Sequence, residues 1–89
     1  MRDSIQVQRK KLYFRAIRRG TKESDAVIGG FAERYLDGLN QEQLDRFEAL
    51  LDRNDPDVLS WVTGLAPVPD EFDHDVMAML KTFKSTLAD

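Results

Sequence analysis

The sequence predicts a small all-α protein, an antiparallel bundle of about five helices formed by one domain that spans residues 1–89. Three observations support this prediction. Apolar residues recur at intervals of three and four along most of the chain, as they do on one face of an α-helix. No segment alternates apolar and polar residues with the β-branched enrichment of a strand. The segments between the helical patterns are short, which favours antiparallel neighbours.

The first predicted helix runs from about Ser4 to Arg19. Asp3 or Ser4 is placed to cap its start, because both side chains accept hydrogen bonds from free backbone N–H groups. Gly20 is expected to end the helix in a left-handed conformation. Residues 1–8 are a candidate flexible extension. The apolar face of this helix consists of Leu12, Tyr13, Ala16 and Ile17.

A second helix is predicted to restart at Thr21 or Lys22. Its first turn is acidic, which suits the positive end of the helix dipole. Gly29 and Gly30 lie inside this helix, at a cost of about 1 kcal/mol each relative to alanine. We therefore expect another segment of backbone to approach closely at these glycines. The predicted apolar face consists of Ile28, Phe31, Ala32, Tyr35 and Leu36.

Capping signals define the later helices. Asn40 and Gln43 form a capping-box pattern for a third helix that runs to about Asp52. Asp55 is expected to cap a fourth helix, which has a proline in its first turn and stops at Gly64.

Asp73 is expected to cap the last helix. The apolar residues expected to face the core from the last three helices are Leu44, Phe47, Leu50, Leu51, Val58, Leu59, Trp61, Val62, Val76, Leu80, Phe83 and Leu87.

Charge is distributed unevenly along the chain. Residues 1–22 hold eight basic residues against one acidic residue, whereas the remainder holds five basic and fifteen acidic residues. Two interpretations stay open: a contact surface for an anionic partner, or a solvated helix face balanced by the acidic body. Tyr13 and Phe14 within this basic segment suit nucleic-acid stacking, but the acidic overall charge argues against that ligand.

Other classes of protein find little support. The chain has no cysteine, which excludes disulfides and thiolate metal sites. No apolar run approaches the roughly 20 residues of a membrane span. No secretory or organellar targeting pattern follows Met1, so we expect a bacterial cytoplasmic protein, or a mitochondrial matrix protein if the source is eukaryotic.

No group of residues predicts catalysis or metal binding. His74 is the only histidine and is interpreted as a solvent-exposed residue in the first turn of a helix. The acidic clusters over residues 52–57 and 70–75 fit helix capping better than a calcium loop. Gly29 and Gly30 lack the following lysine of a phosphate-binding loop. We therefore expect no enzyme activity, no metal and no stably bound cofactor.

The segment Arg19–Glu23 places a glycine between a cation and an anion. A tight connection between helices accounts for Gly20 alone and leaves the charges unexplained. Three segments in register resemble the succinate dehydrogenase flavinylation and FAD assembly factor family. They are Arg19-Gly20-x-x-Glu23-x-Asp25-x-x-Ile28-Gly29-x-Phe31, Arg9-Lys10-Lys11-Leu12-Tyr13-Phe14-Arg15 and Asp55-Pro56-Asp57-Val58-Leu59-Ser60-Trp61-Val62-Thr63-Gly64.

The resemblance implies a five-helix bundle that acts as a non-enzymatic assembly factor. Its implied partner is the flavoprotein subunit of succinate dehydrogenase, or of fumarate reductase in some bacteria, whose covalent FAD attachment it promotes. It also implies that Arg19, Gly20 and Glu23 contact this client near its flavin, with Asp25 beside them. Arg15 completes the predicted partner-binding residues.

The main alternative is a non-catalytic regulatory helical module, either an antitoxin-like partner of a membrane protein or a nucleic-acid binder. An FAD-binding enzyme is a third class, and it would give yellow purified protein. On the leading interpretation we expect a monomer without a nucleic-acid ligand and without membrane insertion. FAD then belongs to the client.

Overall fold

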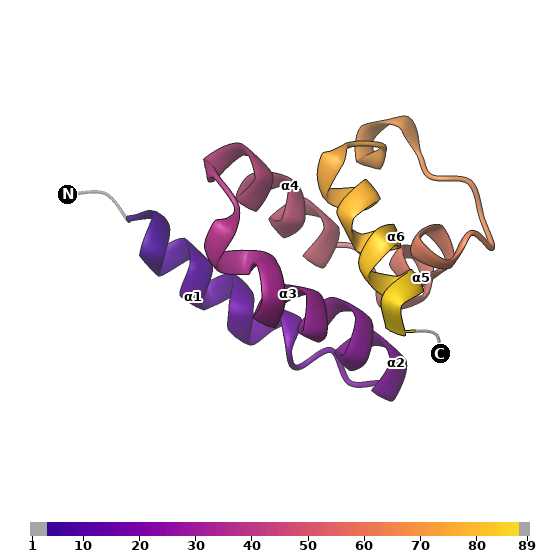
Figure 1. Ribbon diagram of the computed structural model, residues 1–89, viewed down its shortest axis with the longest axis horizontal. Coiled ribbons are helices and arrows are strands. Elements are labelled where there is room, and N and C mark those ends of the chain that lie inside the picture. Colours follow the sequence, from indigo (N-terminus) through magenta and orange to yellow (C-terminus); the bar gives the residue numbers. More distant parts are fainter. Residues whose placement is uncertain (1–3, 88–89) are drawn as a thin grey trace.

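The computed structural model describes residues 4–87, and the predicted all-α fold is confirmed (Figure 1). A π-helical segment, Asp25–Gly29, joins α2 to α3 without a break, so the helices form five continuous rods, as expected. Short 3₁₀ turns cover Leu36–Gly38 and Asp70–Phe72. No strand is present in residues 4–87. The helices are α1 (Ile5–Ala16), α2 (Lys22–Ser24), α3 (Gly30–Tyr35), α4 (Gln41–Leu51), α5 (Asp55–Thr63) and α6 (Asp75–Leu87).

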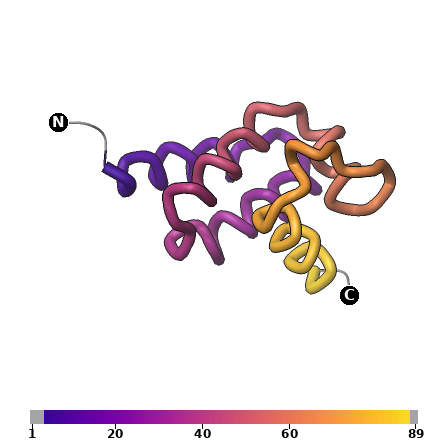
Figure 2. The backbone as a smooth tube through the Cα atoms, turned by 90° about the horizontal axis from the view of Figure 1, so that it is seen from above, coloured from indigo at the N-terminus to yellow at the C-terminus, as the bar shows by residue number. Residues whose placement is uncertain are grey.

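The helices pack around a single core. Helix α1 lies against α3 and α4, while α6 packs on α4, on α5 and on the π-helical segment. Figures 1 and 2 show α5 and the connection that follows it at the end of the molecule opposite the start of α1. The α1–α2 connection therefore runs toward the end of the molecule where α5 lies.

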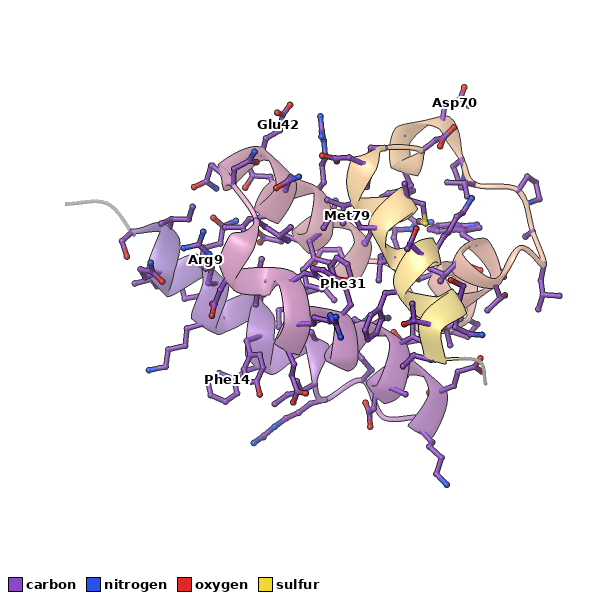
Figure 3. The ribbon with its side chains drawn as sticks, viewed as in Figure 1. Arg9, Phe14, Phe31, Glu42, Asp70 and Met79 are labelled. Carbon is purple, nitrogen blue, oxygen red and sulfur yellow. The ribbon has the colours of Figure 1, made fainter. Side chains whose placement is uncertain are left out.

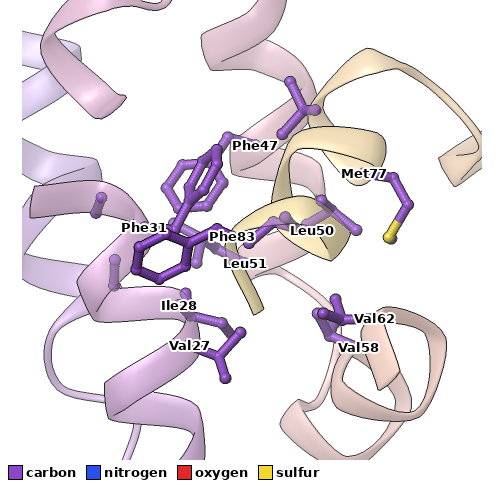
Figure 4. Close-up of a cluster of buried hydrophobic side chains, with 14 of the residues drawn as sticks. Val27, Ile28, Phe31, Phe47, Leu50, Leu51, Val58, Val62, Met77 and Phe83 are labelled. Atoms are coloured by element: carbon purple, nitrogen blue, oxygen red, sulfur yellow. The ribbon is translucent and has the colours of Figure 1, made fainter. Parts of the chain in front are cut away.

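Aromatic residues from three helices meet at the centre of the core (Figure 4). The ring of Phe31 is fully buried, and its centroid lies 5.5 Å from that of Phe47 and 6.2 Å from that of Phe83. Most of the predicted apolar faces are buried. The exceptions are Tyr13, Ile17, Tyr35 and Leu59, which are half-buried, and Leu87, which is exposed. The buried apolar side chains that the helical patterns did not include are Val27, Leu39, Phe72 and Met77.

The first helix ends earlier than predicted. It stops at Ala16 rather than Arg19, although Ser4 caps its start as expected and Asp3 lies outside the described residues. The reason is competition for backbone donors: the N–H groups of Arg19 and Gly20 bind the carboxylate of Asp25, at 3.0 and 3.4 Å, instead of continuing the helical ladder. Gly20 has a positive φ of 109°, as expected, but it lies in the following turn and does not cap the helix.

The start of α1 is tied to α4. Residues 5–8 belong to the helix although the sequence marked residues 1–8 as a candidate extension. The Gln8 amide donates to Asp45 and to Glu48, each at 3.0 Å. These bonds hold the first turns of α1 against the body.

The expected close approach at the paired glycines is confirmed. A Cβ added to Gly29 would lie 3.3 Å from the carbonyl oxygen of Ala16 and 3.3 Å from Cα of Ile17. The π-helical segment thus crosses the end of α1 backbone to backbone, and a Cβ at Gly29 would fit only if the neighbouring backbone moved by a few tenths of an ångström. At Gly30 the neighbour is the ring of Phe83 instead, at 3.1 Å.

Helix α5 begins one residue earlier than predicted. Asn54, not Asp55, is its cap, and the side-chain oxygen of Asn54 accepts the N–H of Asp57 at 2.9 Å. Asp55 is the first helical residue, so its carboxylate is available for another partner. The predicted end is correct, because Gly64 caps α5 in the left-handed conformation with φ 85°.

His74, not Asp73, caps α6. Its Nδ1 accepts the N–H of Met77 at 3.2 Å, so the predictions of an Asp73 cap and of an exposed first-turn histidine were wrong. Partial burial lowers the pKa of His74 below its ordinary value, and the nearby Arg46 cation adds to this effect. Both favour the neutral imidazole, which is the form that can accept the capping hydrogen bond.

Candidate docking site at the Gly20 turn

The turn that joins α1 to α2, residues 17–21, is here named the Gly20 turn. Gly20 is exposed, and an added Cβ would have no atom within 4 Å. The positive φ therefore requires glycine for conformational reasons, and the space outside the turn is open. Thr21 then caps α2 by accepting the N–H of Ser24 at 3.1 Å, as the predicted restart requires. The backbone of the turn thus faces outward at a position where another molecule can approach closely.

Asp25, the first residue of the π-helical segment, holds the Gly20 turn in place. Its Oδ1 accepts the two backbone N–H groups described above, from Arg19 and Gly20. A carboxylate is a strong acceptor for free N–H groups, so these bonds stabilise the shape of the turn. The role of Asp25 within the chain is therefore structural, and its contact with a partner stays a prediction.

Arg19 fastens the turn to the junction between α4 and α5. Its Nε and Nη2 bind Oδ1 of Asp55, at 2.8 and 2.6 Å. Nη2 also lies 3.2 Å from the carbonyl oxygen of Leu51 and 3.3 Å from that of Arg53, which have no helical donor at the end of α4. The side chains of Arg19 and Asp55 are only 12% and 14% exposed. The sequence patterns did not predict this largely buried ion pair, which gives Arg19 a structural role.

Other cations of the basic segment are also used within the chain. Arg15 pairs with Asp52 at 2.6 Å on an exposed surface. Arg9 donates to the carbonyl oxygens of Leu36 and Leu39, at 3.3 and 2.7 Å, and Figure 3 shows it directed toward this part of the body. Phe14, which is not part of the predicted apolar face of the first helix, points away from the body in the same view and is 47% exposed. Arg9 and Arg15 are therefore both engaged in contacts with other parts of the chain.

Two of the five predicted site residues have no side-chain partner among residues 4–87. Gly20 has no side chain, and Glu23 is exposed without an ion pair or hydrogen bond to any of residues 4–87. By contrast, Arg15, Arg19 and Asp25 all bind groups of the chain itself. Among the charged residues predicted to bind a partner, Glu23 is thus the one without a partner in residues 4–87. It lies three residues after the exposed Gly20.

A groove of about 550 Å³ opens beside the Gly20 turn, between α2 and one face of α5. The residues predicted from the sequence as a binding site did not include this groove. The signal available was the i, i+4 spacing of Leu59 and Thr63 on α5, together with a leucine directly after the helix-ending Gly64. The groove is lined by Thr21, Glu23, Asp55, Pro56, Leu59, Ser60, Thr63 and Leu65.

The arrangement around the turn can bind but shows no group of reacting residues. Acidic, basic and apolar side chains lie at its surface, whereas His74 is engaged in capping α6. Across residues 4–87, no three His, Cys, Asp or Glu side chains gather as metal ligands do. None of the helices in this part of the chain combines the length and apolarity that crossing a membrane requires.

Comparison with known proteins identifies related chains. Residues 10–84 match the model of a family described as flavinator of succinate dehydrogenase. The mitochondrial succinate dehydrogenase assembly factor 2 of Debaryomyces hansenii is 38% identical over 81 residues, covering 88% of this chain and 57% of that protein. The corresponding Danio rerio protein is 31% identical over 83 residues, covering 91% and 52%. The FAD assembly factor SdhE of Acetobacter pasteurianus is 41% identical over 69 residues, covering 78% and 63%.

The chain spans between 52% and 63% of the length of these relatives. The family match extends from α1 to α6 and includes the Gly20 turn, the π-helical segment and the α4–α5 junction. All of the contacts that hold the turn lie within it. On this match, the chain belongs to the family of flavinators of succinate dehydrogenase.

Proposed function

We propose that this chain is an assembly factor that binds the flavoprotein subunit of succinate dehydrogenase and promotes covalent attachment of FAD to it. The family description and the names of the relatives support the proposal. The flavoprotein subunit, here called the client, carries the FAD and the reacting groups. The assembly factor is a monomer that acts without catalytic residues or a cofactor of its own. Fumarate reductase is a second expected client, and the compartment is the bacterial cytoplasm or the mitochondrial matrix.

Glu23 lies exposed beside Gly20 without an ion pair or hydrogen bond to any of residues 4–87, and this observation supports docking at the turn. Gly20 allows the client backbone to approach closely, and Glu23 pairs with a client cation in a charge-assisted hydrogen bond. Arg19 and Asp25 keep the turn in the shape that the client meets. In this proposal they contribute mainly by positioning the backbone.

Binding promotes the reaction by alignment. The assembly factor holds the client in a conformation that places its acceptor histidine against the flavin, and the bond forms by chemistry within the client. Alignment alone lowers reaction barriers by up to about 7–11 kcal/mol in favourable intramolecular cases. The assembly factor therefore needs no reacting group of its own.

A gene deletion tests the function. Covalent flavin fluoresces in the flavoprotein band of a denaturing gel, and we expect this fluorescence to fall in the deletion strain and to return with the wild-type chain. Unchanged fluorescence in the deletion strain would contradict the proposed function.

A matched pair of variants tests the site. Glu23→Gln should bind the purified client about tenfold more weakly in calorimetry, because the charge-assisted bond is lost. Glu71→Gln is the control, since Glu71 is likewise exposed without a partner among the described residues and lies outside the site. Equal affinities of the two variants would show that Glu23 does not contact the client.

A further inference from the structure

The groove between α2 and α5 has an apolar surface. Pro56 and Leu59 from α5 form part of its lining, and Leu65 follows where the chain leaves the helix. Leu65 is 86% exposed, whereas Leu59 packs partly against the core. A single exposed leucine is common on protein surfaces. Here it lines a groove that already contains other apolar side chains, so a partner could cover several of them at once.

The groove also carries one uncompensated charge. Two carboxylates line it, those of Glu23 and Asp55. Asp55 is neutralised by Arg19 and is largely buried, whereas Glu23 is exposed and has no partner among residues 4–87. No basic side chain lines the groove. Complementarity therefore requires an occupant that is apolar in part and positively charged beside Glu23.

The groove is continuous with the Gly20 turn. Thr21 and Glu23 belong both to the segment that follows Gly20 and to the groove lining, and the Arg19–Asp55 pair connects the turn to α5. A partner that docks at the exposed glycine therefore meets the groove without any rearrangement of the chain.

We propose that the groove receives a client segment in which an apolar side chain neighbours a lysine or arginine. The apolar side chain packs on Leu59 and Leu65, and the cation pairs with Glu23. This inference rests on the proposed function and extends it from the Gly20 turn to α5. The aliphatic stem of a lysine or arginine also suits the apolar wall, because such stems pack on apolar surface while the charged group stays polar.

The test compares two exposed leucines by calorimetry. The titrant is the client purified from the deletion strain, which has not met the assembly factor. Leu65→Ser should weaken binding about tenfold, since apolar contact in the groove is lost. Leu87→Ser is the control, because Leu87 is also exposed and lies outside the groove, and its affinity should match the wild type. Thermal unfolding of both variants should equal that of the wild type.

The salt dependence of binding distinguishes the contribution of the cation from that of the apolar side chain. Raising NaCl from about 0.05 M to about 0.5 M should shrink the effect of Glu23→Gln, because ions screen exposed charge pairs. The effect of Leu65→Ser should persist. A Leu65→Ser effect that disappears with salt would overturn the apolar part of the proposal.

The outcomes distinguish failure of the groove proposal from failure of the proposed function. Wild-type affinity of Leu65→Ser, with weak binding by Gly20→Arg, overturns the groove and leaves the proposed function intact. No binding of the wild-type chain to the client overturns both. If sedimentation shows that the chain alone dimerises and that Leu65→Ser makes it monomeric, the groove accommodates a second copy and the proposal is wrong.

Discussion

Two connections in this molecule contain a glycine with positive φ, and they are held in different ways. The Gly20 turn is fixed by charged side chains, namely the Asp25 carboxylate and the Arg19 guanidinium. The connection from α5 to α6, residues 64–74, is fixed by packing, with Trp61 stacked on Phe72 at 5.1 Å between centroids. Gly64 in this second connection caps a helix, whereas Gly20 does not.

The difference indicates what each connection does. A helix cap such as Gly64 is sufficient to end a helix, and the apolar residues that follow return the chain to the core. The Gly20 turn instead makes polar contacts with Asp25 of the π-helical segment and with the α4–α5 junction, while its outer side stays exposed. These polar contacts keep the exposed backbone in one shape, which is what a docking surface requires.

The largest expected effect concerns the packed connection. Phe72→Ala should lower the free energy of unfolding by about 3 kcal/mol, because it removes a buried ring stacked on Trp61. Urea unfolding followed by circular dichroism measures this. Phe14→Ala is the control, since Phe14 is exposed, and should change stability by less than about 0.5 kcal/mol. Similar losses for both variants would mean that the connection does not depend on packing.

Loss of the Arg19–Asp55 ion pair should give the next largest effect. Arg19→Met should lower the free energy of unfolding by roughly 2 kcal/mol, because Asp55 and the carbonyl groups at the end of α4 lose their hydrogen-bond donor in a largely buried place. Arg15→Met removes an exposed ion pair and should cost less than about 0.5 kcal/mol. Equal costs in urea unfolding would show that burial of the Arg19–Asp55 pair is unimportant.

Alanine at the two glycines should separate an effect on stability from an effect on binding. Gly20→Ala and Gly64→Ala should each lower the free energy of unfolding by about 1 kcal/mol, because both force a side chain into a positive-φ conformation with open space around it. In calorimetry, Gly20→Ala should bind the client more weakly than the wild type, whereas Gly64→Ala should bind it equally well. If Gly64→Ala weakened client binding as much, the effect would reflect general loss of stability.

The smallest effect concerns the His74 cap. His74→Ala should lower the free energy of unfolding by about 0.5 kcal/mol at pH 7.5, where the imidazole is neutral and accepts a hydrogen bond from the Met77 N–H. The pKa of His74 is lowered in the folded chain, so its contribution is complete above the ordinary value of 6.5 and is lost as pH falls through the folded pKa. The difference between wild type and variant should therefore vanish in acid. A difference that stays constant down to pH 4.5 would exclude a histidine cap.

Local signals predicted the helices well. The Asn40–Gln43 capping box and the Gly64 stop are encoded within a few residues and were correct. The end of α1 was wrong because a carboxylate six residues after Arg19 takes its N–H group, and the pattern within α1 carries no sign of that competition. Capping by His74 was missed because histidine was interpreted from its acidic neighbours rather than as an acceptor.

The site could be predicted only in part. Positive φ at Gly20 and the exposure of Glu23 agree with the short motif around them. The partner of Arg19 lies 36 residues away, so nothing next to Arg19 in the sequence reveals the ion pair. The groove likewise depends on two segments that folding brings together, and only one wall of it could be read from helical spacing.

The attachment of Arg19 to the carbonyl groups of Leu51 and Arg53 has a consequence for genetics. A screen for alleles that fail to engage the client should recover lesions in residues 51–55, although these residues hold the turn from behind. Such alleles would have the same phenotype as mutations of residues that contact the client. Second-site suppressors within the chain should rescue them by restoring the contacts of Arg19, whereas suppressor mutations in the client should rescue only mutations of the contact surface.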